Sequence, residues 1–316
     1  MKKSLIALAA MGLAGAAMAQ SSVTLYGVAD AGVGKMEYGA AAGLNDSSDK
    51  WQFTSASRIN NGNSRLGVRG VEDLGGNMQA GFNFETGLDL DDGSAQGSGG
   101  GHWGRAANLW LGGNWGTFKL GRSLNPSFYG AAAWELTGMA NYSNVGNTYG
   151  WGSGGPRNNS QFSYKTPTFL GGLSAELAYV TKYDNGGASK WDSNIIYANG
   201  PLAASVNVNK IKGEHVHYAL GGKYSFGMFT VAGGYAQASV NKLYRRGFML
   251  GGTATFGAAA ITVDMSRDTK NEWSNKKYTN GIVEGKYALS KRTFAYAIYS
   301  RFDGTNNYGF GVRHNF

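Results

Sequence analysis

The sequence predicts an all-β fold, a transmembrane antiparallel β-barrel of sixteen strands. The first observation is alternation: in residues 307–316 apolar and aromatic side chains of one parity oppose polar residues and glycines of the other, as in a strand between lipid and water. The second is composition, because 51 glycines stand against 4 prolines and no cysteine in 316 residues. The third is a succession of segments of about ten residues between turn signals, the length that a tilted strand needs to cross a bilayer.

Residues 1–19 are typical of a secretory signal peptide. Two lysines precede an apolar stretch, residues 5–18, that closes with Ala17-Met18-Ala19. This stretch is too short to cross a bilayer as a helix, and no later segment reaches the roughly 20 apolar residues that a spanning helix needs. A soluble exported protein would carry the same signal, so the barrel prediction for residues 20–316 rests on the strands.

The expected strands alternate with connections of two kinds. Tight turns are expected at residues 73–76, 114–116, 199–201, 226–228 and 256–257, whereas residues 34–62, 89–102 and 124–157 form long connections. Short turns on one rim and long loops on the other are typical of an outer-membrane barrel. The expected strands are 22–33, 63–72, 77–88, 103–113, 116–123, 158–166, 172–181, 190–199, 201–209, 216–226, 228–238, 246–256, 258–266, 277–287, 292–301 and 307–316.

Charged residues within the strands indicate which parity faces the lumen. Glu85 and Glu176 lie mid-strand, and a carboxylate facing lipid would be costly, so both should face the lumen. Arg105 falls in phase with Leu109 and Leu111, which predicts a β-bulge in segment 103–113.

The chain is basic, with a formal net charge of +9. Its basic residues are scattered singly through alternating segments and are not clustered in an arm, so we expect no nucleic-acid partner. For an exported chain, the charge is better interpreted as a field acting on small anions or on acidic lipid headgroups. The absence of cysteine excludes disulfides and thiol chemistry, and we expect no cofactor or metal.

Five stretches carry a family resemblance. They are residues 64–76 (SRLGVRGVEDLGG), 22–27 (SVTLYG), 116–122 (GTFKLGR, followed by Asn125-Pro126), 289–293 (LSKRT) and 311–316 (GVRHNF). Together they resemble the general porins of beta-proteobacteria, the neisserial and burkholderial group. The resemblance implies a homotrimer of barrels in the outer membrane of a Gram-negative bacterium. Each barrel would be a water-filled pore narrowed by an inward-folded third loop, here residues 124–157.

The resemblance also implies a ladder of arginines beside this loop, at Arg65, Arg105, Arg122 and Arg157. A guanidinium stays charged at any relevant pH and presents several donors to a passing anion. Glu85 and Glu135 are expected to face the arginines across the aperture. The implied function is a general diffusion channel for small hydrophilic solutes with a modest preference for inorganic anions.

The terminal Phe316 is expected to be a membrane-insertion signal. Outer-membrane lipid, lipopolysaccharide and the barrel-assembly machinery are the further partners that the resemblance implies. The expected location of the protein is the outer membrane, which it would reach after its signal peptide is cleaved.

Other interpretations stay open. The arginines could serve only to neutralise lumen carboxylates and tie the loop to the wall. A channel specific for a sugar or an organic anion is an alternative. Sugar specificity would require several tryptophans along one continuous track of the lumen. The tryptophans near expected strand ends or in loops are Trp51, Trp103, Trp134, Trp151, Trp191 and Trp273. A barrel enzyme or an adhesin is less favoured, because none of the four histidines, His102, His215, His217 and His314, lies in a recognisable nucleophile motif.

Overall fold

The computed structural model describes residues 21–37, 50–96, 101–150, 152 and 154–316. The predicted signal peptide therefore lies outside the described residues. Over the described part of the chain, no helix is long and apolar enough to cross a membrane.

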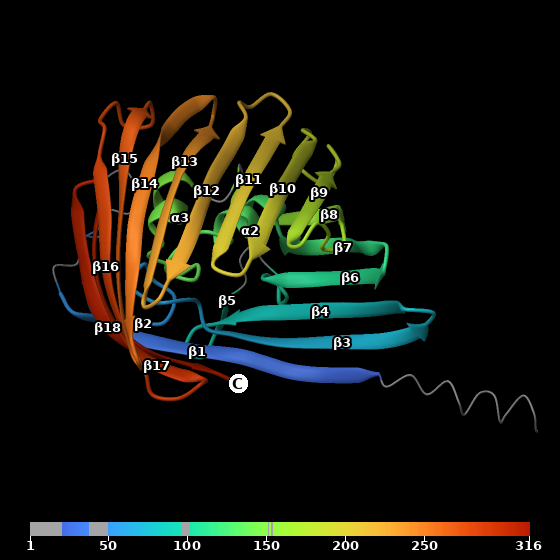
Figure 1. Cartoon of the computed structure of the whole chain (residues 1–316), viewed down its shortest axis with the longest axis horizontal. Coiled ribbons are helices and arrows are strands. Elements are labelled where there is room, and N and C mark those ends of the chain that lie inside the picture. The colour runs from blue at the N-terminus through green and yellow to red at the C-terminus, as the bar shows by residue number, and fades with distance from the viewer. Residues whose placement is uncertain (1–20, 38–49, 97–100, 151, 153) are drawn as a thin grey trace, which may run out of the picture.

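The fold is a closed antiparallel barrel, as predicted (Figure 1). Of the eighteen strands that the described residues form in one sheet, β2 (Gln52–Thr54) and β5 (Ala95–Gln96) are short additions to β1 and β4. The other sixteen form the wall, and the last of them pairs with the first. These are β1 (Ser22–Met36), β3 (Arg65–Gly75), β4 (Met78–Leu88), β6 (Ala106–Gly113), β7 (Gly116–Leu124), β8 (Arg157–Lys165), β9 (Leu173–Val180), β10 (Lys190–Asn199), β11 (Leu202–Ile211), β12 (His217–Phe226), β13 (Phe229–Val240), β14 (Leu243–Phe256), β15 (Ala259–Asn271), β16 (Thr279–Ala288), β17 (Thr293–Phe302) and β18 (Thr305–Asn315).

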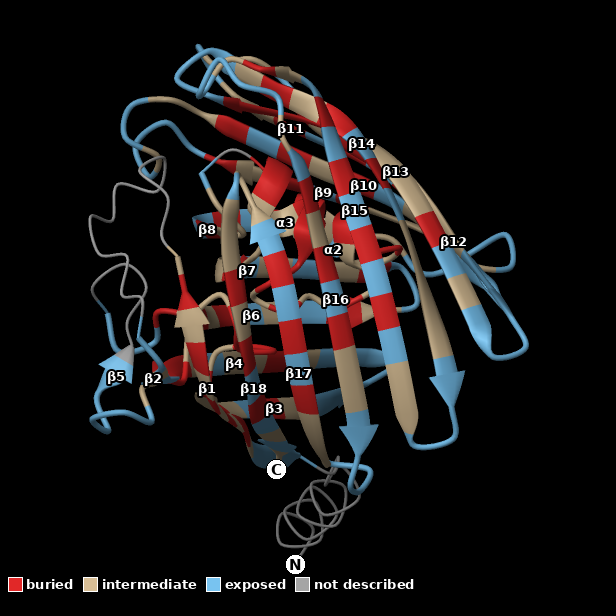
Figure 2. Ribbon diagram, turned by 90° about the vertical axis from the view of Figure 1, so that its left-hand side faces the viewer, coloured by how far each residue is buried: buried red, intermediate tan, exposed pale blue. Residues whose placement is uncertain are grey.

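The wall has its apolar side outward. On β15 the exposed residues Ile261, Val263 and Met265 alternate with the buried polar residues Thr262 and Asp264. The same alternation gives the banded strands of Figure 2. Because neighbouring side chains of a strand point to opposite faces, this pattern puts apolar groups outside and polar groups in the lumen.

Connections at the two rims differ in length. At the rim that holds Phe316, tight turns such as those at Gly227 and Gly257 use the left-handed backbone conformation (φ 57° and 61°). The opposite rim carries the long connections. Two connections on that rim are nevertheless only two residues long, and one of them, Asn241-Lys242, has positive φ at both positions (51° and 62°), the geometry of a tight hairpin turn.

The longest of these connections, residues 125–156, folds into the barrel, and we call it the inner loop. It contains α2 (Pro126–Ala132) and α3 (Asn144–Tyr149), both of which lie inside the wall in Figure 1. The Asn125 side chain caps α2 by accepting a hydrogen bond from Phe128 N (2.7 Å).

Hydrogen bonds fasten α2 to the wall. The backbone N–H and the hydroxyl of Ser127 both donate to Asp192 Oδ1 on β10 (2.8 and 2.7 Å). Ser205 on β11 donates to the carbonyl of Gly130. A Cβ at Gly130 would stand only 2.8 Å from Asn207 Cβ, so glycine permits this close approach.

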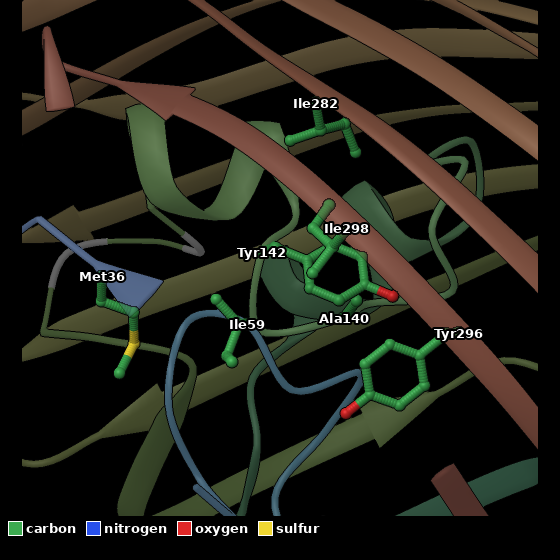
Figure 3. Packing of buried hydrophobic residues seen from close by; sticks show 7 residues of the cluster. All are labelled: Met36, Ile59, Ala140, Tyr142, Ile282, Tyr296 and Ile298. Atoms are coloured by element: carbon green, nitrogen blue, oxygen red, sulfur yellow. The ribbon is translucent and has the colours of Figure 1, made fainter. Parts of the chain in front are cut away.

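Two apolar clusters fix the remainder of the inner loop. In one, Trp134, Val145 and Tyr149 of the loop pack on Ala236 and Met249 of the wall. In the other, shown in Figure 3, Ala140 and Tyr142 meet Ile59 of the connection between β2 and β3 and four residues of the wall, Met36, Ile282, Tyr296 and Ile298. The inner loop therefore covers the wall from β10 to β17 and leaves the lumen open on the side of β1 to β8.

The bulge predicted near Arg105 is wrong. The register of β4 and β6 runs unbroken from Gln79 opposite Gly112 to Glu85 opposite Ala106. Arg105 precedes β6, so its side chain is not bound by the parity of that strand. A register shift occurs instead between β7 and β8, at Gly121 and Ser123.

Candidate functional site

Two cavities of about 530 and 570 Å³ lie in the open part of the lumen. The first, the outer cavity, is bordered by residues of the two long connections, and the second, the inner cavity, reaches Ser22 at the start of β1. Four residues line both cavities: Glu85, Arg105, Leu124 and Arg157. We call these four residues the constriction.

At the constriction, the carboxylate of Glu85 lies close to two guanidinium groups. Arg105 Nε lies 2.7 Å from Glu85 Oε1, and Arg65 Nε lies 3.6 Å from Glu85 Oε2. The Tyr26 hydroxyl also donates to Glu85 Oε2 (3.0 Å). Arg157 donates through Nε to the backbone carbonyl of Arg105 (2.8 Å), which orients its side chain without neutralising its charge. The structure thus brings together Arg65, Arg105, Arg157 and Glu85 of the predicted site.

Further cations surround this group. Arg58 and Arg313 line the outer cavity, and Arg69 and Lys119 line the inner cavity. Arg313 donates through Nη1 to Asn61 Oδ1 (2.9 Å). Sequence reasoning missed these four residues as site members, although Arg313 stands on the polar parity of the terminal strand, a signal that could have placed it in the lumen. Around Glu85, positive charge is in clear excess.

Arg122 does not join the constriction, and this is a correction. Its side chain lines a neighbouring cavity with Asn159, which Arg157 also borders, and it donates to the carbonyl of Gly104 (2.6 Å) and to the Asn159 side chain. The reason is its phase on β7: Arg122 pairs with Ala107 and shares its parity with the outward-facing Leu120.

Glu135 also lies elsewhere than predicted. It is 3 % exposed, between the inner loop and the wall. Its carboxylate accepts from the Thr137 hydroxyl and from Met139 N (2.9 Å), and its carbonyl accepts from Lys223 Nζ (3.5 Å). The chain turns back toward the wall after α2, so Glu135 fixes this turn and does not face the arginines.

Two tyrosines of the inner loop remain neutral at physiological pH. Burial, together with the nearby Glu176, raises the pKa of Tyr129 to about 12. Burial and the neighbouring Glu284 raise the pKa of Tyr142 well above its usual value. Tyr142 donates to the Glu284 carboxylate and accepts from Asn61 Nδ2 (2.8 Å). Neither phenol therefore adds negative charge to the lumen.

Phe316 completes the seam between β18 and β1. Its N–H donates to the carbonyl of Gly27 (3.1 Å), and its carbonyl accepts from Gly27 N (3.0 Å). Its ring lies where a Cβ of Gly27 would be, and the residue is 48 % exposed on the outward face.

Residues considered for other chemistries are dispersed. His215 stacks on Tyr244 with ring centroids 4.3 Å apart, whereas His217 is buried in the wall. Across the described residues, no three or more His, Cys, Asp or Glu side chains are grouped to hold a metal ion. Trp134 is buried between the inner loop, to which it belongs, and the wall, and Trp191 lies half-exposed on the outward face. Trp151 lies outside the described residues.

Comparisons with known proteins agree with this architecture. The family model for Gram-negative porins matches residues 4–307, so the chain belongs to the Gram-negative porins. These are channels of the outer membrane and not enzymes.

The chain is 36% identical to outer membrane porin protein 32 of Delftia acidovorans over 326 residues, covering 94% of this chain and 88% of that protein. It is 30% identical over 279 residues to an outer membrane porin protein of Bordetella pertussis, covering 76% of this chain and 70% of that protein. Among solved structures, the anion-selective porin from Comamonas acidovorans has a TM-score of 0.77 and 25% identity, with 94% of this chain and 100% of that chain covered.

Proposed function

We propose that this porin is a general diffusion channel for small hydrophilic solutes whose lumen modestly prefers anions. The observation that carries the proposal is the constriction and its neighbour Arg65, where three guanidiniums surround the single carboxylate of Glu85. The similar structure from Comamonas acidovorans is described as anion-selective, which supports the same preference here.

The preference follows from charge in a narrow, partly dehydrated space. An ion in the constriction experiences a lower effective dielectric than in bulk water, so charges that solvent would screen still discriminate. Arginine suits this position because it cannot lose its charge at physiological pH. Cations spread over both cavities, such as Arg313 and Lys119, pass an anion along without one deep trap.

The test is the reversal potential of the purified protein in a planar bilayer under a potassium chloride gradient. We expect a potential that leans toward chloride. The double variant Arg105→Gln and Arg157→Gln should move it toward the value of an unselective pore. The matched control is Arg267→Gln, at an exposed position that lines neither lumen cavity, and it should move the potential much less. An unchanged potential in a folded double variant would refute the role of the constriction.

We further propose that the protein is a homotrimer and that residues 1–19 are removed during export. We also propose that it contacts lipopolysaccharide and is inserted by the barrel-assembly machinery, with Phe316 as part of the signal. The exposed ring of Phe316 at the end of the seam supports the last point. Deleting Phe316 should slow membrane insertion more than folding in detergent, and equal insertion rates for both forms would count against this role.

A further inference from the structure

The constriction has an apolar edge as well as a cationic one. Leu124 lines both cavities, Phe128 lines the outer cavity, and Tyr129 lines the inner cavity. The two rings are 5.8 Å apart and nearly perpendicular (86°). An apolar surface from one short segment, residues 124–129, therefore extends along the lumen on both sides of Arg105 and Arg157.

The attachment of α2 explains why these rings face the lumen. The helix buries Pro126, Ser127, Gly130 and Ala131 against the wall. With that face fixed by the bonds to Asp192 and Ser205, the remaining face points into the lumen, and Tyr129 there is 36% exposed. The rings thus belong to a rigid part of the inner loop.

Cationic groups lie close to this apolar edge. Lys119 Nζ stands 6.0 Å from the centre of the Tyr129 ring, and Arg105 and Arg157 line the same cavity. Because Tyr129 stays uncharged, an anion near the ring meets positive charge and an apolar surface together, not a phenolate. This combination differs from what a small inorganic ion requires.

We propose that the lumen preferentially takes up monocarboxylates with an aromatic body, with the carboxylate held by Arg105 and Arg157 and the ring lying against Phe128 and Tyr129. This inference rests on the proposed anion preference and names the solute class that gains most from it. The carboxylate satisfies guanidinium donors, and the body removes apolar surface from water in the same position. Partial burial of one ring gives a modest gain, as a channel that must release its solute requires.

The test is the reduction of chloride current by benzoate compared with propionate, both monoanions with one carboxylate. In the wild type we expect benzoate to halve the current at a concentration about fivefold lower than propionate does, from partial burial of the ring. The double variant Phe128→Ser and Tyr129→Ser should reduce this ratio to less than twofold, whereas Tyr129→Phe should keep it. Tyr183→Ser, on an 86% exposed tyrosine outside the lumen cavities, is the matched control.

The outcomes separate the two proposals. Equal block by benzoate and propionate in a wild type with a chloride-leaning reversal potential would overturn the aromatic preference alone. A preference for benzoate that persists in the double serine variant would overturn the assignment to these rings. A wild-type reversal potential that leans toward potassium would refute the anion preference itself.

Discussion

The side of the lumen covered by the inner loop, β10 to β17, and the open side, β1 to β8, are both polar, but their charged residues are arranged differently. Behind the inner loop, cations lie beside acids: Lys286 Nζ is 2.9 Å from Glu284, and Arg245 Nε is 3.0 Å from Asp268. On the open side, β1 to β8, Arg65 and Arg105 share Glu85, and Arg157 beside them bonds only to a backbone carbonyl. Paired charges hold the loop in place, while the excess charge of the open side is left to act on solutes.

The difference teaches that lumen-facing parity does not by itself define a functional residue. Lys286 also donates to the carbonyl of Thr137 in the inner loop (3.0 Å), so its charge is used to position the loop. Arg157 is directed by a backbone carbonyl and keeps its full charge beside the cavities. Substitutions on the side covered by the inner loop should therefore affect stability, and substitutions on the open side should affect ion selectivity.

The largest effect is expected from Trp134→Ala in the inner loop. Trp134 is 1% exposed and fills the space above Gly221 and Gly234. Its removal should lower the free energy of unfolding by about 3–5 kcal/mol, because a large cavity remains. The measurement is the unfolding temperature by far-UV circular dichroism. Trp103→Ala, at a 42% exposed site, is the control, and similar losses in both variants would contradict the packing role of Trp134.

A smaller effect is expected from Gly130→Val, which pushes α2 away from the wall. The new side chain would collide with Asn207, so we expect a destabilisation of about 1–3 kcal/mol and an altered single-channel conductance. Ala132→Val changes a half-buried position of the same helix and should alter both quantities less. Wild-type conductance in the folded Gly130→Val protein would show that the contact with β11 does not set the position of the loop.

On the open side of the lumen, Glu85→Gln removes the carboxylate that Arg65 and Arg105 share. It should increase the difference in net charge between the open side and the side covered by the inner loop. We expect the chloride-to-potassium permeability ratio to rise by roughly a factor of two, since one opposing charge disappears at the constriction. Reversal potentials measure this ratio. Glu272→Gln, which alters an ion pair with Lys270 beyond the lumen cavities, is the control and should leave the ratio nearly constant. A fall of the ratio in Glu85→Gln would contradict the assigned role.

The smallest effect is expected from pH. Guanidiniums do not titrate in the physiological range, and Tyr129, with its pKa raised to about 12 by burial, stays neutral. Its deprotonation would add negative charge and weaken anion preference, but only near that pH. The reversal potential should therefore change little between about pH 6 and 9. A loss of chloride preference within this interval would indicate that another titrating group controls the lumen.

Most of the fold could be predicted from the sequence because a strand's period of two is local information. The same pattern put Glu85 and Glu176 in the lumen, where the structure has both buried or bordering a cavity. The prediction that Arg122 belongs to the constriction is wrong, because a sequence motif does not show which face of the strand a side chain takes next to a register shift. Glu135 was misplaced because the path of the inner loop depends on contacts with strands far along the chain.

The seam between β1 and β18 constrains the order of assembly. Along one edge of β1, residues from Val28 to Met36 pair with Asn315 to Asn307, at the other end of the polypeptide. Until synthesis and export deliver that final strand, the backbone groups along this edge of β1 have no partner from β18, and an open edge of this kind readily pairs with other chains. The growing protein is therefore exposed to premature association over nearly its whole passage, and the barrel can close only after its last strand has arrived.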